Sequence, residues 1–222
     1  MSLKPPKASD MNKSWMTKRR NRAIKIKPEY HLIVTEGEKT EPLYFEQIKQ
    51  IINNAYGNRI QIKVEGEGKN TLQLFDAALR MAKNDPNGFS HVWIVFDTDD
   101  FRSEDINRTA ELCEQHSSDN CKYHAIWSNQ CIELWYLLHF GFYQSDIHRN
   151  EYYPRLSRHL TEDGHGEYAK NRPDMYEILR PKMDTAVENA KKLDEKNAGK
   201  SPAASAPGTK VYEIIEKLKA YL

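Results

Sequence analysis

Residues 92–97, with the sequence Val-Trp-Ile-Val-Phe-Asp, decide the fold class of this 222-residue chain. The five apolar residues show no alternation with polar ones, which predicts a strand buried on both faces, as in the centre of a parallel sheet. The run leads directly into three acidic residues, Asp97, Asp99 and Asp100. A strand of this kind needs neighbouring strands and helices that cover both faces of the sheet, and the flanking sequence predicts both.

Strands and helices alternate along residues 31–140. Strands are predicted at 31–35, 60–64 and 122–127, and the helices that follow the four strands begin near Thr40, Thr71, Ser103 and Cys131. Four such units predict an α/β fold, with a Rossmann-like parallel sheet flanked by helices on both faces. Residues 141–222 contain helical patterns near 174–179 and 183–193 and an amphipathic last helix at 211–222. We therefore expect a mainly helical C-terminal extension.

Charge and composition divide the chain further. Residues 1–30 carry 9 basic and 2 acidic side chains, whereas the remaining residues carry a formal charge of −6. We predict a basic, partly disordered tail at 1–30, a core at 31–140, an extension at 141–222, and a flexible loop at 194–209, where large apolar residues are absent. Three cysteines, no apolar leader and no apolar run of about 20 residues argue against secreted disulfide scaffolds and membrane proteins, and favour the cytoplasm.

Acidic residues follow two of the predicted strands. Glu36 comes after the first, and Asp97, Asp99 and Asp100 come after the third. The carboxyl ends of parallel strands lie at one edge of a sheet, where ligands bind. Clustered carboxylates repel one another unless a cation or hydrogen bonds offset the repulsion, and hard oxygen ligands suit Mg²⁺ or Mn²⁺. The alternative is that these acids only cap turns and helix starts.

Further candidates lie close to the same edge. Glu133 interrupts an apolar run just after the fourth strand, where a buried carboxylate needs a partner, although it could also face solvent or cap the helix. Lys39 lies in the loop beside Glu36, while Glu38 and Glu41 resemble ordinary exposed turn glutamates. A later segment mixes groups that suit base stacking and phosphate contact, or an ordinary surface. Its members are Tyr152, Tyr153, Arg155, Arg158, His159, Tyr168, Lys170 and Arg172.

Two other motifs are weaker. The segment 66–71 has a glycine-rich turn but lacks the spacing of a nucleotide-binding P-loop. Cys113 and His116 could form a zinc site with Cys121 and His124. The second pair falls within or beside a predicted strand, however, where residues three apart point to opposite faces.

Three segments together resemble a known family. They are Val34-Thr-Glu-Gly-Glu-Lys-Thr-Glu-Pro-Leu-Tyr-Phe45, Asp97-Thr-Asp-Asp100, and Ser128-Asn-Gln-Cys-Ile-Glu-Leu-Trp-Tyr-Leu-Leu-His-Phe140. They are similar to the RloB-like proteins, which have a Toprim-type fold related to the nuclease domains of OLD proteins. The resemblance extends from about residue 31 to the last helix.

The resemblance implies a Toprim catalytic core in which Glu36, Asp97 and Asp99 bind Mg²⁺ or Mn²⁺. It also implies a prokaryotic cytoplasmic protein, encoded near restriction-modification or anti-phage genes, with an RloA-type AAA/ABC-like ATPase as its partner. We therefore expect a metal-dependent nuclease that cleaves DNA or RNA phosphodiesters in defence, with Asp100 and Glu133 assisting and Lys170 or Lys39 stabilising charge. The alternatives are a non-catalytic nucleic-acid-binding or regulatory subunit, and a nucleotide phosphohydrolase.

Overall fold

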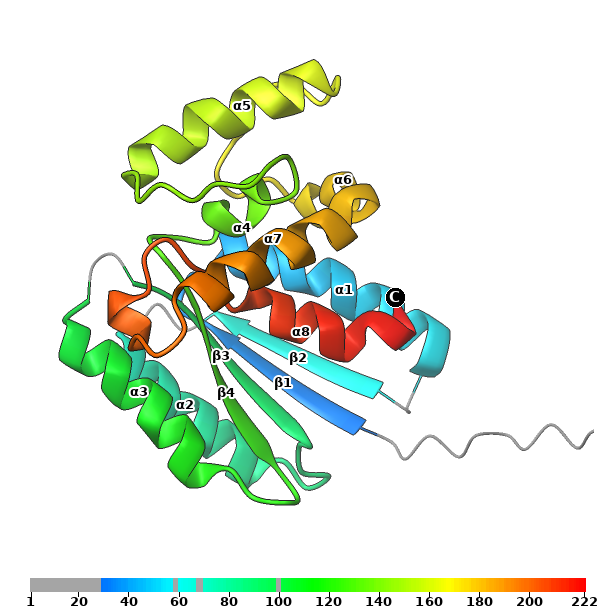
Figure 1. The fold of residues 1–222 in the computed structure, drawn as a ribbon. Helices are drawn as coiled ribbons and strands as arrows, with labels where there is room; N and C mark the ends of the chain where they lie inside the picture. The colour runs from blue at the N-terminus through cyan, green and yellow to red at the C-terminus, as the bar shows by residue number, and fades with distance from the viewer. Residues whose placement is uncertain (1–28, 58–59, 67–69, 99–100) are drawn as a thin grey trace, which may run out of the picture.

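The chain folds around one four-stranded sheet. The computed structural model describes residues 29–57, 60–66, 70–98 and 101–222, so residues 1–28 of the predicted tail, and also Asp99 and Asp100, lie outside the described residues. The strands are β1 (Glu29–Thr35), β2 (Ile60–Gly66), β3 (His91–Asp97) and β4 (Lys122–Ser128). They are all parallel and follow the order β2-β1-β3-β4, with helices on both faces (Figure 1). The predicted α/β, Rossmann-like class is confirmed.

Strand β3 lies inside the sheet and is buried on both faces, as its sequence predicts. Trp93 and Val95 face one hydrophobic core, whereas Val92, Ile94 and Phe96 face the other. Strand β1 alternates in the same way, with Ile33 in the first core and its two neighbours in the second. Burial on both faces explains why these two strands are continuously apolar.

Two layers of helices supply the two cores. Helices α2 (Thr71–Asn84) and α3 (Ser103–His116) cover one face of the sheet, and α1 (Thr40–Tyr56) and α8 (Val211–Leu218) cover the other (Figure 1). Helix α7 (Met183–Lys196) packs against α8 and against the short α4 (Glu133–Leu137). None of the helices in the described parts of the chain is both long and apolar enough to cross a bilayer.

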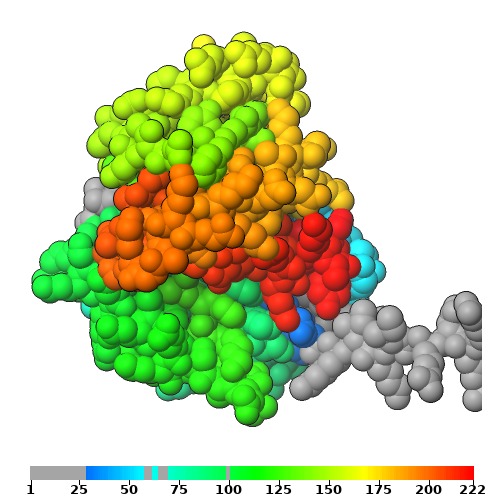
Figure 2. Space-filling model, viewed as in Figure 1, coloured from blue at the N-terminus to red at the C-terminus, as the bar shows by residue number. Residues whose placement is uncertain are grey.

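The remaining helices of the extension, α5 (Tyr152–Glu162) and α6 (Met175–Leu179), pack on α4 and α1 (Figure 1). Helix α5 follows the 3₁₀ turn η3 (Arg149–Glu151) and packs against α4 (Figures 1 and 2). Helix α6 packs against α1 and leads through η4 (Arg180–Lys182) into α7. The extension is thus mainly helical, and it places Arg149, Lys170 and Asn171 next to the edge of the sheet where the predicted acids lie.

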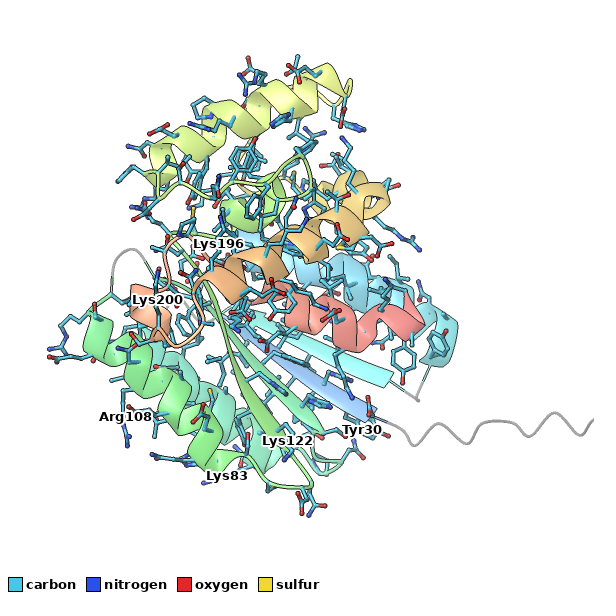
Figure 3. All side chains as sticks on the ribbon, in the orientation of Figure 1. Tyr30, Lys83, Arg108, Lys122, Lys196 and Lys200 are labelled. Atoms are coloured by element: carbon cyan, nitrogen blue, oxygen red, sulfur yellow. The ribbon has the colours of Figure 1, made fainter. Side chains whose placement is uncertain are left out.

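The segment 194–209 is packed, although its composition predicts a flexible loop. Its first three residues belong to α7, and η5 (Pro202–Ala204) follows, near the labelled Lys196 and Lys200 in Figure 3. The side chain of Asn197 donates a hydrogen bond to the Pro207 carbonyl (2.8 Å). A Cβ on Gly208 would lie 2.9 Å from the Trp127 ring, so the small residue permits close packing at this position.

Candidate functional site

A pocket with a volume of about 380 Å³ lies at the carboxyl ends of β1 and β3. Its walls come from the loop after β1, the start of α1, the end of β3, the start of α4 and two positions of the extension. Charged side chains dominate the lining. They are Glu36, Glu38, Lys39, Glu41, Asp97, Glu133, Arg149 and Lys170. The structure therefore brings together every described residue among the predicted site residues.

Glu36 and Asp97 lie on neighbouring strands and are joined directly. The Glu36 backbone N–H donates to the Val95 carbonyl (2.9 Å), which extends the β1–β3 ladder by one residue. The Asp97 backbone N–H in turn donates to Oε2 of the Glu36 carboxylate (3.0 Å). Asp97 also pairs with Ser128 of β4, so its position is fixed from both sides. The two carboxylates are therefore positioned by the sheet.

Glu41 also belongs to the pocket, which corrects the expectation of an ordinary exposed turn glutamate. It lies in the first turn of α1 and is only 4 % exposed. Its carboxylate packs directly on Gly37, where an added Cβ would overlap Oε2 of Glu41. The missing side chain at Gly37 is what makes room for this carboxylate. Glu38, in contrast, is exposed.

Glu133 is a further buried carboxylate of the pocket and begins helix α4. It is 1 % exposed, and its Oε1 accepts a hydrogen bond from the Tyr168 hydroxyl (2.8 Å). This contact joins the extension to the core across 35 residues of sequence. The alternative of a solvent-facing glutamate is therefore excluded.

Two of the carboxylates, Asp97 and Glu41, have a raised proton affinity. Burial raises the pKa of Asp97 well above its ordinary value, and Glu41, Glu36 and Glu133 raise it further, while Lys170 opposes them. Burial, followed by the charge of Glu133, likewise raises the pKa of Glu41, against its own backbone hydrogen bond and Lys170. These shifts show that the cations lining the pocket only partly offset the repulsion between its acids.

Lys170 reaches the pocket on a loop that is fastened to the core. The next residue, Asn171, has a positive φ of 73°, and its Oδ1 accepts a hydrogen bond from the Thr40 hydroxyl (3.1 Å). Thr40 begins α1, one residue before Glu41. Lys170 and Lys39 are both exposed lining residues. The pocket therefore combines a buried acidic floor with basic groups near the solvent.

The donor set suits a hard divalent cation. Within the described residues, no three His, Cys, Asp or Glu side chains are arranged as a complete metal centre. Mg²⁺ does not need one, because it keeps several waters and is bound by one or two carboxylates together with substrate phosphates. Buried carboxylates that repel one another are the ligands such an ion would stabilise, so the residues fit the predicted Mg²⁺ or Mn²⁺.

The proposed cysteine and histidine site does not form. His124 Nε2 lies 3.0 Å from His91 Nδ1, and both rings stack with Trp93. This cluster lies near the amino-terminal ends of β3 and β4, away from the pocket. Cys113 is buried, which raises the pKa of its thiol to about 12. In the part of the chain that the structure describes, no three of these side chains come together as a metal site.

Comparison with known proteins agrees with this architecture. Residues 31–218 match the family described as RloB-like protein. The chain belongs to the RloB-like family. The match includes most of β1, the elements from α1 to α8 and all the lining residues of the pocket. No curated protein and no solved structure gives a significant match to this RloB-like chain.

Proposed function

We propose that this RloB-like protein is a Toprim-type, metal-dependent nuclease that hydrolyses phosphodiester bonds of nucleic acid. One observation carries the proposal: carboxylates from the loop after β1, the start of α1, the end of β3 and the start of α4 meet in one pocket at the carboxyl edge of a parallel sheet, with Lys170 beside them. The raised pKa of Asp97 supports it, since such a cluster of acids lacks sufficient positive charge of its own.

Mg²⁺ or Mn²⁺ would be held by Glu36 and Asp97, with Glu41 and Glu133 lining the same pocket. Asp99 and Asp100, which the family resemblance adds, lie outside the described residues. The ion supplies charge neutralisation at the phosphate, a lower pKa for bound water, and stabilisation of the leaving oxygen. The chain's own part is to fix the carboxylates through the sheet and to keep them largely out of bulk water.

Basic groups of the pocket have a separate role. Lys170 is placed to stabilise the negative charge that develops on the phosphate, and Lys39 is a second group for the same purpose. Arg149 lines the pocket from η3, the turn before α5, where a guanidinium suits contact with a neighbouring phosphate. Tyr168 acts on Glu133, whose carboxylate it orients.

Membership of the RloB-like family supports the wider biological proposal. We propose that the protein acts in the cytoplasm of a prokaryote, in defence against phage or linked to restriction-modification, together with an RloA-type AAA/ABC-like ATPase. In this proposal the ATPase controls the reaction, and the present chain cleaves the phosphodiester bond.

The proposal is tested first by metal binding, which requires neither the partner nor the substrate. Thermal unfolding is followed with and without Mn²⁺ for the wild type, Asp97→Asn, and Glu46→Gln as a control glutamate on α1 outside the pocket. A metal at 100 times its Kd adds about 2.7 kcal/mol to the free energy of unfolding. Wild type and Glu46→Gln should gain stability, and Asp97→Asn should gain much less.

Cleavage then separates an enzyme from a binding subunit. Labelled DNA and RNA are incubated with the protein and Mn²⁺, alone and with the ATPase. Cleavage that Asp97→Asn abolishes supports the proposed nuclease. Binding of nucleic acid without cleavage under all these conditions would favour the non-catalytic subunit, and turnover of free nucleotides alone would favour the phosphohydrolase.

A further inference from the structure

The aromatic and basic residues between 152 and 172 have different roles in the structure. Tyr152 is completely buried, and its hydroxyl donates to the Asn129 carbonyl (3.3 Å). Arg155 pairs with Glu151, and Arg172 pairs with Asp174. These members hold the extension together and do not suit a ligand contact. Tyr153 differs from them, because it is partly exposed.

Tyr153 is connected to the carboxylate floor through one other side chain. Its ring stacks on Tyr168, with ring centroids 5.8 Å apart and an interplanar angle of 22°. The Tyr168 hydroxyl donates to Glu133 at the pocket floor (2.8 Å). One face of the Tyr153 ring is therefore supported by Tyr168, which fixes its orientation relative to the acids.

The charges of pocket residues also act on the Tyr153 hydroxyl. Burial raises the pKa of Tyr153 to about 12, and the charges of Glu133 and Asp97 contribute to the rise, while Arg149 lowers the pKa. Arg149 lines the pocket and lies four residues before Tyr153, in the turn that leads into α5. The ring thus lies within electrostatic range of two acids of the pocket and of this arginine.

The shape of the pocket restricts what can reach the acids. Its volume of about 380 Å³ is near the lower end of the range for small-molecule sites, about 300–1,000 Å³. Glu41 and Glu133 are almost fully buried within it. A stiff duplex keeps its bases paired and stacked inside the helix. A single strand can bend its backbone into such a pocket and turn a base outward onto an aromatic ring.

We infer that the substrate is a single-stranded nucleic acid, and that an unpaired base beside the scissile phosphate stacks on the ring of Tyr153. This inference rests on the proposed nuclease function, and it adds the substrate class and a residue that selects it. The pocket floor receives the phosphate, and the Tyr168-supported ring of Tyr153 receives the base. Stacking tolerates every base, so the contact selects unpaired structure and carries little sequence preference.

Binding is measured by fluorescence anisotropy with a short labelled strand, as DNA and as RNA, and with the same strand in a duplex. The protein carries Asp97→Asn so that the probe is not consumed. The single strand should bind more tightly than the duplex. Adding Tyr153→Ala should weaken single-strand binding about 5- to 150-fold, the effect of losing one stacked base, while Tyr153→Phe should keep most of it.

Tyr56→Ala is the matched control. Tyr56 is also a partly exposed tyrosine whose ring contacts another tyrosine, Tyr221 (5.2 Å between centroids), but it lies at the end of α1, outside the pocket. The Tyr56→Ala substitution should leave single-strand binding unchanged. Thermal unfolding of each variant with Mn²⁺, in the wild-type Asp97 background, verifies that the fold and the carboxylate site survive.

The outcomes separate the inference from the proposed function. Equal binding of strand and duplex, unaffected by Tyr153→Ala, would overturn the inference, while cleavage that needs Asp97 would leave the nuclease standing. Tyr153-dependent strand binding without any cleavage would overturn the nuclease and keep the single-strand assignment. Binding of mononucleotides alone would overturn both.

Discussion

The backbone N–H of Asp97 donates a hydrogen bond to the carboxylate of Glu36, with 3.0 Å between the nitrogen and Oε2. The two residues lie 61 positions apart in sequence and end two adjacent parallel strands. The carboxylate therefore stabilises the edge of the sheet and also lines the pocket. These two roles can be separated by substitution, because only one of them requires a negative charge.

Glu36→Gln should preserve the sheet edge and remove the metal response. The amide oxygen of Gln can accept the Asp97 N–H, and loss of the charge relieves repulsion of the Asp97 carboxylate. Glu36→Ala leaves that N–H without this acceptor, which costs about 1–3 kcal/mol. In urea unfolding without metal, the Glu36→Gln variant should be at least as stable as wild type, and the Glu36→Ala variant should be less stable. Both should lose stabilisation by Mn²⁺, and equal destabilisation by Gln and Ala would contradict the prediction.

Gly37→Ala should displace the carboxylate of Glu41. The new Cβ would overlap Oε2 of Glu41, so the buried side chain must move. Because small misplacements in an active site cost about 100-fold in rate, we expect a loss of cleavage of that order and a weaker Mn²⁺ response. Gly141→Ala is the control, since its Cβ would make only an ordinary contact of 3.6 Å with Tyr143. Full activity of Gly37→Ala would show that Glu41 takes no part in the site.

Tyr168→Phe should weaken the site through Glu133. The ring can still stack on Tyr153, but the buried Glu133 carboxylate loses a hydrogen-bond donor (2.8 Å). A hydrogen bond to a charged group contributes about 1.5–3 kcal/mol, so both the free energy of unfolding and the cleavage rate should fall. Tyr143→Phe is the matched variant, because it removes a hydroxyl that pairs with His159 (2.7 Å) away from the pocket. It should lower stability without lowering the cleavage rate.

The edge of the sheet could be predicted because its signals are local. The apolar run 92–96 identifies a strand buried on both faces, and the acids that follow two strands must then lie at one edge. Glu133 was predictable for a related reason, since it interrupts an apolar run immediately after a strand. Each of these inferences needs only the sequence near the residue and the rules of parallel sheets.

Glu41 could not be identified in this way, because its burial depends on contacts that are distant in sequence. Its carboxylate packs on Gly37, and the Thr40–Asn171 hydrogen bond beside it joins residues 131 positions apart. Helix α5 was also missed, although Tyr152, Leu156 and Leu160 repeat every four residues and are all buried. The packing of 197–210 depends on Gly208 fitting against Trp127, which composition alone does not indicate.

Histidines near the amino-terminal ends of the strands should make the stability of the protein depend on pH. His31 is fully buried, and its Nδ1 accepts a hydrogen bond from the Trp93 ring N–H (3.2 Å). Burial, together with the charges of His91, Lys217 and His124, lowers its pKa from 6.5 to about 3. Burial likewise lowers the pKa of His91 and of His124 to about 4. All three rings therefore stay neutral in the folded protein at pH values where they are protonated in the unfolded chain.

The unfolded chain thus binds more protons than the folded chain between about pH 6.5 and pH 4, so these histidines lower stability as the pH falls. His31 alone should cost about 2 kcal/mol between pH 7 and pH 5. The raised pKa of Asp97 acts in the opposite direction, so the wild-type profile alone does not isolate the histidine effect. The His31→Asn variant isolates this effect, because the asparagine side-chain oxygen can still accept the hydrogen bond from the Trp93 ring N–H, while the titrating imidazole is gone. Urea unfolding at pH 7 and pH 5 should show a smaller acid-dependent loss for His31→Asn than for wild type, and parallel profiles would contradict the assignment.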